Sequence, residues 1–335
     1  MERQKFALSH WCFVFVLAYS SSVFGWGKTG HEAIALIAEA HLSHVAQQRV
    51  RELLGNTDLL EASNWPDKIR YTDAWKHTYN YHFTQSPDGM NYLEALAQQL
   101  PEQRKKGDAL RALVKSEDIL RDSTIPSDKK VYALKFFLHF FGDYQQPLHT
   151  GRPEDRGGND IRMNWFGRTS NIHSVWDTGI IQERLRPVEF AGEQEPMENS
   201  EARRYISLLP TPGQDTLADW LKGGMLKWHD ESLALRTVAY LAPTIPNKEY
   251  FKQTSPVIDQ LILKIGHRLA HVLNMIFERP MDLDPEGQQL RLALDQILGP
   301  KHDTMIVLEP QENKGHKLPY YLAPLEVHEC HHDVE

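Results

Sequence analysis

Cysteine is nearly absent from this chain of 335 residues, which contains only Cys12 and Cys330. We expect Cys12 to be removed with an N-terminal export signal, so the mature protein would keep one thiol and could form no intramolecular disulfide. The triplet Asn-x-Ser/Thr is also missing, and N-glycosylation is therefore not expected. An exported protein without disulfides or glycans is more typical of bacteria than of fungi or plants.

A hydrophobic run long enough to span a membrane is missing as well. Residues 1–25 instead show the pattern of a secretory signal, with Arg3 and Lys5 at a positive start, an apolar stretch over 6–19 and a cleavage region at 23–25. The alternative is an uncleaved anchor, but polar residues interrupt the hydrophobicity. No later segment approaches the roughly 18 continuous apolar residues of a membrane helix. We predict a secreted or periplasmic protein without stable membrane association after signal cleavage.

The chain lacks an excess of positive charge. Lys and Arg number 37 against 45 Asp and Glu, which gives a formal net charge of -8. A broad basic surface normally dominates the affinity of proteins for nucleic acid, so any attraction for phosphate must be local here. The hydrophobic content of 41% and the charged content of 24% are those of a soluble globular protein and exclude disordered and collagen-like classes.

Apolar residues recur at helical spacing through most of the chain. The predicted helical segments follow His31 as far as residue 54 and then cover 92–100, 109–120, 131–144, 172–185, 201–209, 217–241, 257–277 and 288–298. Only 161–166, bounded by glycines, alternates like a strand of a short hairpin. We therefore predict a mainly α protein with one compact domain over 26–279 and a peripheral extension or mobile tail over 280–335.

The most informative segment is "FFLHFFGDYQQPLH" at 136–149. His139 and Asp143 are four residues apart, so a helix places both on one face where they can converge on an ion. His149 follows a helix-breaking proline. His173 and Asp177 repeat the same spacing. One such pair alone is more simply a surface hydrogen bond, but repeated burial of these groups among aromatic residues is costly without a compensating charge.

Further candidates lie upstream and between these pairs. Asp67 and Arg70 are expected in a loop after Trp65-Pro66, and the segment "HTYNYHF" adds His77 and His82. Each of these could be an ordinary surface residue on its own. Together with the later pairs they form a set of imidazoles and carboxylates of the kind that zinc prefers. More than one ion is needed to use them all.

The ordered motifs "WGKTGH", "WPDKIR", "YHF", "FLHFFGDYQQPLH", "GGN" and "HSVWD" together resemble the zinc-dependent class I nucleases, the family of nuclease S-one and nuclease P-one. The resemblance extends from Trp26 to about Phe277. It implies a helical domain of the phospholipase C/P-one nuclease type that holds three zinc ions.

The resemblance also implies a ligand set. One ion would be held by Asp67, His82, His139 and Asp143, a second by His149, His173 and Asp177, and a third by His31, Asp143 and the backbone of Trp26. A peptide nitrogen inside a chain has no available lone pair, whereas a free α-amine, with a pKa near 8, can lose its proton and coordinate zinc. Cleavage after Gly25 would therefore create a metal ligand at Trp26.

The implied reaction is hydrolysis of single-stranded RNA and DNA by a metal-activated water, with 5'-phosphate products and with 3'-nucleotides as further substrates. Asp67 would orient the water or accept its proton, and Arg70 would stabilise the phosphate in the transition state. Phe83 matches the family's base-stacking aromatic residue, and Asn159 is a candidate substrate contact. Gln85 stands where fungal members have an acidic residue, which leaves base preference open. We expect a monomer.

Two alternatives remain at this point. A zinc phospholipase C is a related helical hydrolase with three zinc ions and an N-terminal tryptophan, although the short spacing from Trp26 to His31 follows the nuclease pattern. A metal-binding protein without catalysis is the other alternative. It could use the chain end "HECHHDVE", which contributes His328, Cys330, His331 and His332.

Overall fold

A computed structural model of the chain describes residues 26–186, 200–242, 244–300 and 302–311. The predicted signal peptide and the His-rich end of the chain lie outside the described residues. The prediction of a mainly α fold is confirmed, since the strands form a single hairpin and nearly all other regular structure is helical. Among the described residues, the structure contains no helix with the length and apolar character needed to span a membrane.

The α-helices are α1 (Lys28–Ala40), α2 (His44–Leu54), α3 (Leu59–Ile69), α4 (Tyr92–Gln98), α5 (Pro101–Arg104), α6 (Ala109–Arg121), α7 (Ser127–Asp143), α8 (Ile172–Ser174), α9 (Ile180–Leu185), α10 (Glu201–Ser207), α11 (Gln214–Trp220), α12 (Gly224–Ala239), α13 (Asn247–Glu278) and α14 (Pro285–Leu298). Strand β1 (Arg162–Trp165) pairs antiparallel with β2 (Arg168–Asn171), as the alternation at 161–166 predicts. A 3-10 helix, η1 (Lys76–His82), precedes Phe83.

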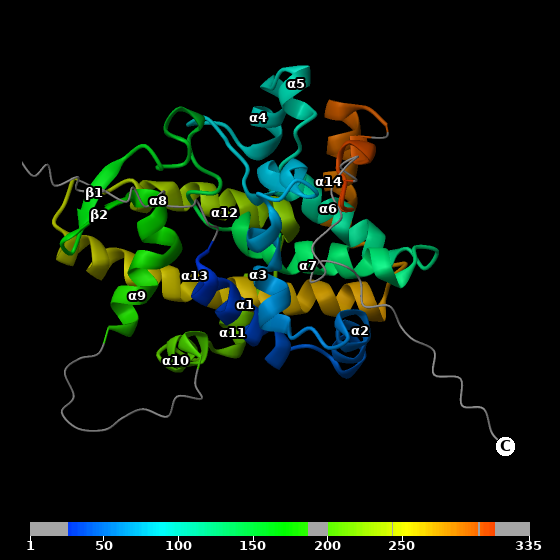
Figure 1. Ribbon diagram of the computed structural model, residues 1–335, viewed down its shortest axis with the longest axis horizontal. Helices are drawn as coiled ribbons and strands as arrows, with labels where there is room; N and C mark the ends of the chain where they lie inside the picture. The colour runs from blue at the N-terminus through cyan, green and yellow to red at the C-terminus, as the bar shows by residue number, and fades with distance from the viewer. Residues whose placement is uncertain (1–25, 187–199, 243, 301, 312–335) are drawn as a thin grey trace, which may run out of the picture.

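Helix α13 runs along most of the length of the molecule, and α1 packs against it near its middle (Figure 1). Helix α1 packs against α13, α3 and α10, while α7 packs against α6 and α3. The core between these helices is rich in aromatic side chains, including the fully buried Phe136, Phe137, Phe140 and Phe141. This arrangement places a few polar residues of α1, α3 and α7 in the interior, namely His31, Asp67, His139 and Asp143.

Two predicted helices differ from a single regular α-helix. The segment 217–241 is divided into α11 and α12 because Gly223 has φ of 96° and Gly224 has φ of 65°, a conformation that glycine adopts without steric cost. The segment 172–185 is continuous but contains a π-helical turn at Val175–Gly179 between α8 and α9. Such turns are frequent at functional sites, and this one contains Asp177.

The chain after α13 packs back onto the domain as far as residue 311. Leu290 and Leu294 of α14 are buried against neighbouring helices, and Ile306 and Leu308 are buried further along. The backbone N–H of Gln311 donates a 2.9 Å hydrogen bond to the carbonyl oxygen of Ala74. The described part of the C-terminal segment therefore contributes to the same hydrophobic core.

Candidate metal centre

The last turn of α7 forms the middle of the candidate site. His139 and Asp143 are both fully buried, and the helix places their side chains on one face, with 3.2 Å between Nε2 of His139 and Oδ2 of Asp143. The neighbouring phenylalanines exclude water from this face. Charged and polar atoms in such surroundings need partners, because desolvation is otherwise expensive.

The carboxylate of Asp143 joins side chains from distant parts of the chain. Its Oδ1 atom lies 3.3 Å from Nε2 of His31 on α1 and 3.7 Å from Nδ1 of His149. Its Oδ2 atom lies 3.2 Å from Nδ1 of His82 at the end of η1. One buried carboxylate thus faces four imidazoles, as expected of a bridging metal ligand.

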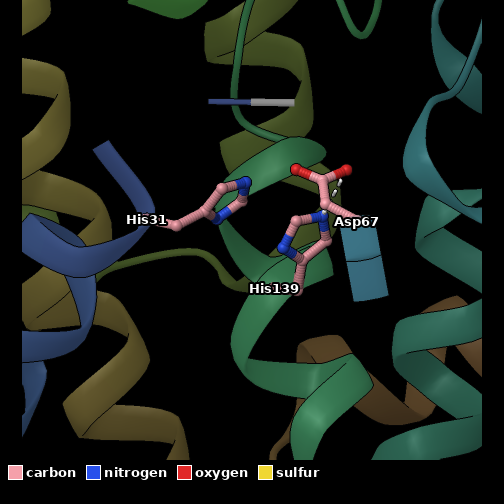
Figure 2. A group of neighbouring side chains, drawn as sticks. All are labelled: His31, Asp67 and His139. Atoms are coloured by element: carbon pink, nitrogen blue, oxygen red, sulfur yellow. Dashed lines mark ion pairs between the residues drawn. The ribbon is translucent and has the colours of Figure 1, made fainter. Parts of the chain in front are cut away.

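Asp67 approaches the same group from α3. Its Oδ1 atom lies 3.6 Å from both Nδ1 of His82 and Nε2 of His139. Figure 2 shows the carboxylate of Asp67 directed toward the imidazole of His139, with His31 beside it. The rings of His31 and His139 are stacked with centroids 3.9 Å apart. The first cluster therefore consists of His31, Asp67, His82, His139 and Asp143.

The expectation that Asp67 lies in a loop is wrong. Helix α3 continues through Pro66 to Ile69, and the N–H of Arg70 still bonds to the carbonyl oxygen of Pro66. A proline inside a helix removes one backbone donor without preventing the following turn from forming. Asp67 consequently has a fixed helical backbone, which orients its carboxylate more strictly than a loop would.

A second cluster lies beside the first. Nε2 of His149 is 3.6 Å from Oδ1 of Asp177, and Nε2 of His173 is 3.3 Å from Oδ2 of the same carboxylate. The side-chain amide of Gln146 donates a hydrogen bond to Oδ1 of Asp177. Because His149 also faces Asp143, the two clusters are contiguous.

Backbone carbonyls fix the orientation of three imidazoles. Nδ1 of His139 lies 2.7 Å from the carbonyl oxygen of Ser63, Nδ1 of His149 lies 2.6 Å from that of His82, and Nδ1 of His173 lies 2.6 Å from that of Gly157. A carbonyl can only accept, so each Nδ1 carries the proton. Each Nε2 then points toward the carboxylates, which is the usual arrangement around metal-ligating histidines.

The electrostatics of the clusters favour bound positive charge. Burial alone would lower the pKa of His139, but the carboxylates of Asp143 and Asp67 raise that pKa to about 10. Burial likewise opposes ionisation of Asp143, yet the neighbouring imidazoles, His139 first among them, hold its pKa well below the usual range. His82 behaves differently, since burial lowers its pKa to about 4. The carboxylates are thus ionised and require cationic partners.

Several buried ligand atoms have no hydrogen-bond partner among the described residues. They are Nε2 of His31, His82, His149 and His173, together with Oδ1 of Asp67 and Asp143. Buried polar atoms are rarely left unpaired without a reason such as a bound ion. Potential ligand atoms in the two clusters also lie within 4.8 Å of one another in groups of three. Imidazole and carboxylate donors at these separations fit zinc.

Trp26 packs against the chain next to a predicted ligand of the first cluster. Its side chain is fully buried, and Nε1 donates a 3.1 Å hydrogen bond to the carbonyl oxygen of Gly142. The next backbone N–H, that of Gly27, donates a 2.8 Å hydrogen bond to the carbonyl oxygen of Asp177. The indole of Trp26 thus bonds to the residue before Asp143, and the residue after Trp26 bonds to the backbone of Asp177. Coordination by its α-amine remains a prediction.

The other predicted site residues differ in their contacts and exposure. The guanidinium of Arg70 is buried, with Nη1 located 3.2 Å from Oδ1 of Asp67. Phe83 and Gln85 are partly exposed and line one cavity beside His82. Asn159 is mostly buried, and its amide donates to the carbonyl oxygen of Arg156, which stabilises the glycine-rich turn. His77 lies apart from the clusters and contacts Val307 instead.

The family model of the S1/P1 nuclease matches residues 26–278 of this chain. The chain belongs to the S1/P1 nuclease family. It is 30% identical over 294 residues to nuclease S1 of Aspergillus oryzae, covering 79% of this chain and 96% of that protein. It is 29% identical to endonuclease 2 of Arabidopsis thaliana, with 79% and 94% coverage, and 26% identical to nuclease P1 of Penicillium citrinum, with 75% and 97% coverage. The family resemblance inferred from the motifs is confirmed.

Membership in the S1/P1 nuclease family identifies the protein as a nuclease, a hydrolase acting on nucleic acids. Enzymes of this family are in general zinc-dependent. That property agrees with the imidazole and carboxylate groups described above.

Sequence reasoning missed the groups that support the ligands. Gln146 is part of the segment that indicated the metal site, and its position three residues after Asp143 was the available signal. The carbonyls of Ser63, His82 and Gly157 could not be identified from the sequence, because every residue carries a backbone carbonyl group. Position 157 can be occupied without strain only by glycine. Its φ is 66°, and a Cβ there would lie 2.3 Å from the carbonyl oxygen of Leu148.

Proposed function

We propose that this protein is an exported, zinc-dependent phosphodiesterase that cleaves single-stranded RNA and DNA to 5'-phosphate products and also acts as a 3'-nucleotidase. The observation that carries this proposal is the shared carboxylate of Asp143, which joins two clusters of buried ligand atoms, several of them without a hydrogen-bond partner. The imidazoles and carboxylates of the two clusters, together with Trp26, would supply enough donor atoms for three zinc ions. The similarity to nucleases S1 and P1 supports nucleic acid as the substrate.

Bound zinc would acidify water and neutralise phosphate charge, lowering the pKa of the water from 15.7 toward roughly 7. Asp67 would hold and orient the attacking water through Oδ1, which faces the centre of the first cluster. Its 3.2 Å contact with Arg70 places a guanidinium beside the same position. Arg70 would stabilise the charge that develops on phosphate, because its planar fork matches phosphate oxygens and remains protonated.

Phe83 would bind a base of the substrate. It directly follows the ligand His82 and remains partly exposed, so a ring stacked on it would lie close to the metal centre. Stacking tolerates different bases but requires an unpaired one. This requirement is the physical reason for preferring single strands.

Export would complete the metal centre. Removal of residues 1–25 would give Trp26 a free α-amine. The indole of this residue bonds to Gly142, and the N–H of the next residue, Gly27, bonds to Asp177. We infer that the third zinc ion uses this amine, the imidazole of His31 and the carboxylate of Asp143. The mature protein would then be a secreted or periplasmic monomer.

The decisive experiment is an assay of the purified mature protein on single-stranded RNA, single-stranded DNA, 3'-nucleotides and phosphatidylcholine, with and without chelator. We expect hydrolysis of the nucleotide substrates, its loss with chelator and its recovery with zinc. Product analysis should find 5'-phosphates. Chelator-resistant hydrolysis would contradict the metal mechanism, and cleavage of the lipid alone would favour a phospholipase.

The role of the N-terminal amine is tested separately. A protein that keeps one extra residue before Trp26 should bind fewer zinc ions than the mature protein, as measured by elemental analysis. An acetylated mature N-terminus serves as a second test that leaves the chain length unchanged. Full zinc content in both proteins would contradict coordination by the amine.

A further inference from the structure

A cavity of about 380 Å³ opens next to Phe83, on the side formed by α4 and α5. The loop around Phe83 and Gln85 forms one wall, and α4, α5 and the turn after α5 form the other. The backbone carbonyl of Phe83 accepts a 3.1 Å hydrogen bond from the N–H of Ala109, which fixes the two walls relative to each other. A volume of this size accommodates a small ligand such as a nucleoside.

The polar side chains that line the cavity are mainly uncharged. Five side-chain amides line the cavity, from Asn80, Gln85, Gln98, Gln99 and Gln103. Amides offer both donors and acceptors without charge, which suits the edges of nucleobases. One of them is already engaged, because Oε1 of Gln103 accepts a hydrogen bond from the N–H of Leu100.

The charged lining residues are Asp108 and Lys106. Asp108 is buried, and its carboxylate already accepts hydrogen bonds from the hydroxyl of Tyr92 and the N–H of Arg111. Lys106 is exposed on the turn after α5. The ammonium of Lys106 is thus the cation that the cavity offers to an anionic ligand.

We propose that α4 and α5 complete a nucleotide subsite in which the amides contact the base stacked on Phe83 and Lys106 binds the phosphate on the 5' side of that nucleotide. The inference rests on the proposed function, because it takes Phe83 as the platform for the nucleotide that carries the scissile 3'-phosphate. It adds a specificity element that none of the metal ligands supplies. Recognition of a second phosphate would favour a polymer over a mononucleotide.

Lys105 provides a matched control. It is the neighbouring lysine and is also exposed, but it does not line the cavity, and its ammonium lies 2.9 Å from Oε1 of Glu102. Lys105→Gln and Lys106→Gln therefore make the same change of charge at adjacent positions. Only the second removes a cation from the cavity.

The test compares adenosine 3'-phosphate with adenosine 3',5'-bisphosphate, which differ only in the 5'-phosphate. The mature, zinc-loaded enzyme should have a kcat/KM for the bisphosphate about tenfold above that for the monophosphate, as one charge-assisted contact would give. Lys106→Gln should abolish this preference, mainly by raising KM for the bisphosphate. Lys105→Gln should retain the preference.

Equal preference ratios in Lys105→Gln and Lys106→Gln would overturn the assignment of Lys106. So would a wild-type enzyme that does not distinguish the two substrates. Failure of the proposed function looks different, because the wild-type enzyme would then hydrolyse neither adenosine phosphate. The two failures can therefore be separated in one set of assays.

The amide wall is tested by base preference. Gln99→Leu on the cavity side should change the ratio of kcat/KM between adenosine and uridine 3'-phosphates by at least about threefold, a modest effect for loss of one hydrogen bond. Gln47→Leu on α2, outside the cavity, should leave the ratio unchanged. An unchanged ratio in Gln99→Leu would overturn the role given to this amide.

Discussion

The backbone N–H of Val307 donates a 3.2 Å hydrogen bond to the hydroxyl oxygen of Tyr81, the residue directly before the predicted ligand His82. On the same segment, the carbonyl oxygen of Val307 lies 3.2 Å from Nε2 of His77. Both contacts are to η1. The C-terminal segment, which lies beyond the residues matched by the family model, thus supports η1, which ends at the predicted ligand His82 and directly precedes Phe83.

Removal of residues 280–335 should destabilise the enzyme strongly. The deletion removes four buried apolar side chains, Leu290, Leu294, Ile306 and Leu308, with a combined contribution of about 6 kcal/mol or more. We expect the melting temperature to fall by at least about 10 °C. Met281→Ala, at an exposed side chain of the same segment, is the control and should have little effect. A truncated protein that melts at the same temperature as Met281→Ala would show that the segment does not support the core.

Asp143→Asn should empty most of the metal centre. The substitution keeps the size of the side chain but removes the charge that faces His31, His82 and His139. We expect loss of most bound zinc, as measured by elemental analysis. Activity should fall by more than about 100-fold, because loss of a group that only supports a ligand typically costs 10-fold to 100-fold. Asp160→Asn, at an exposed carboxylate, should retain zinc. Normal zinc content in Asp143→Asn would contradict the bridging role.

Gly157→Ala should weaken the second cluster. The residue has positive φ, and the added methyl group would collide with the carbonyl oxygen of Leu148. Strain of about 1–3 kcal/mol is expected from the backbone alone, and the displaced carbonyl would no longer orient His173. Gly167→Ala is a useful comparison, since Gly167 also has positive φ but open space around it. Equal zinc affinities in the two variants would exclude a specific role for Gly157.

Arg70→Met should reduce catalysis while leaving zinc binding intact. The change removes the guanidinium beside Asp67 but keeps an apolar stem of similar length. We expect kcat/KM for single-stranded DNA to fall about 100-fold, the size of effect seen when one transition-state donor is lost. Lys68→Met alters a neighbouring exposed cation and should retain nearly full activity. Normal kcat/KM in Arg70→Met would show that Arg70 takes no part in the reaction.

His267 should make the fold sensitive to acid. Burial and the neighbouring imidazole of His41 lower its pKa to about 4, and the two ring centroids are 4.2 Å apart. The unfolded chain, with a pKa near 6.5, binds the proton more readily. The stabilising contribution of neutral His267 is therefore present above about pH 6.5 and is lost as the pH falls toward 4.

The measurement is the melting temperature of His267→Gln and the wild-type protein between pH 7 and pH 4. The wild-type protein should lose more stability over this interval than the variant. His44→Gln, at an exposed histidine of α2, should follow the wild-type curve. Parallel curves for all three proteins would contradict the assignment.

The helical fold could be predicted because it depends on local spacing, and the same spacing predicted that His139 lies beside Asp143. His139 and Asp143 converge through one turn of a helix, and the apolar period around them indicated that helix. The order of the remaining motifs then matched a known family. These signals are properties of short segments, which a single sequence displays directly.

Other features depend on contacts between distant segments. Pro66 suggested a loop before Asp67, but packing of α3 against α1 and α7 maintains the helix through the proline. Gly223 could have continued a helix or ended it, and its backbone conformation is set by the surrounding fold. The contacts of Val307 with η1 join residues that have no common pattern in sequence. No local rule would have identified them.

The four imidazoles around Asp143 come from α1, η1, α7 and the turn that follows α7. Bringing such distant positions together requires the intervening chain to be ordered, and loop-closure entropy opposes this. A molecule in which these elements have not packed together keeps the pair His139–Asp143 of α7 but lacks the complete cluster. For a nuclease this dependence on the finished fold would be protective, since a chain that is still folding would leave the nucleic acids around it intact.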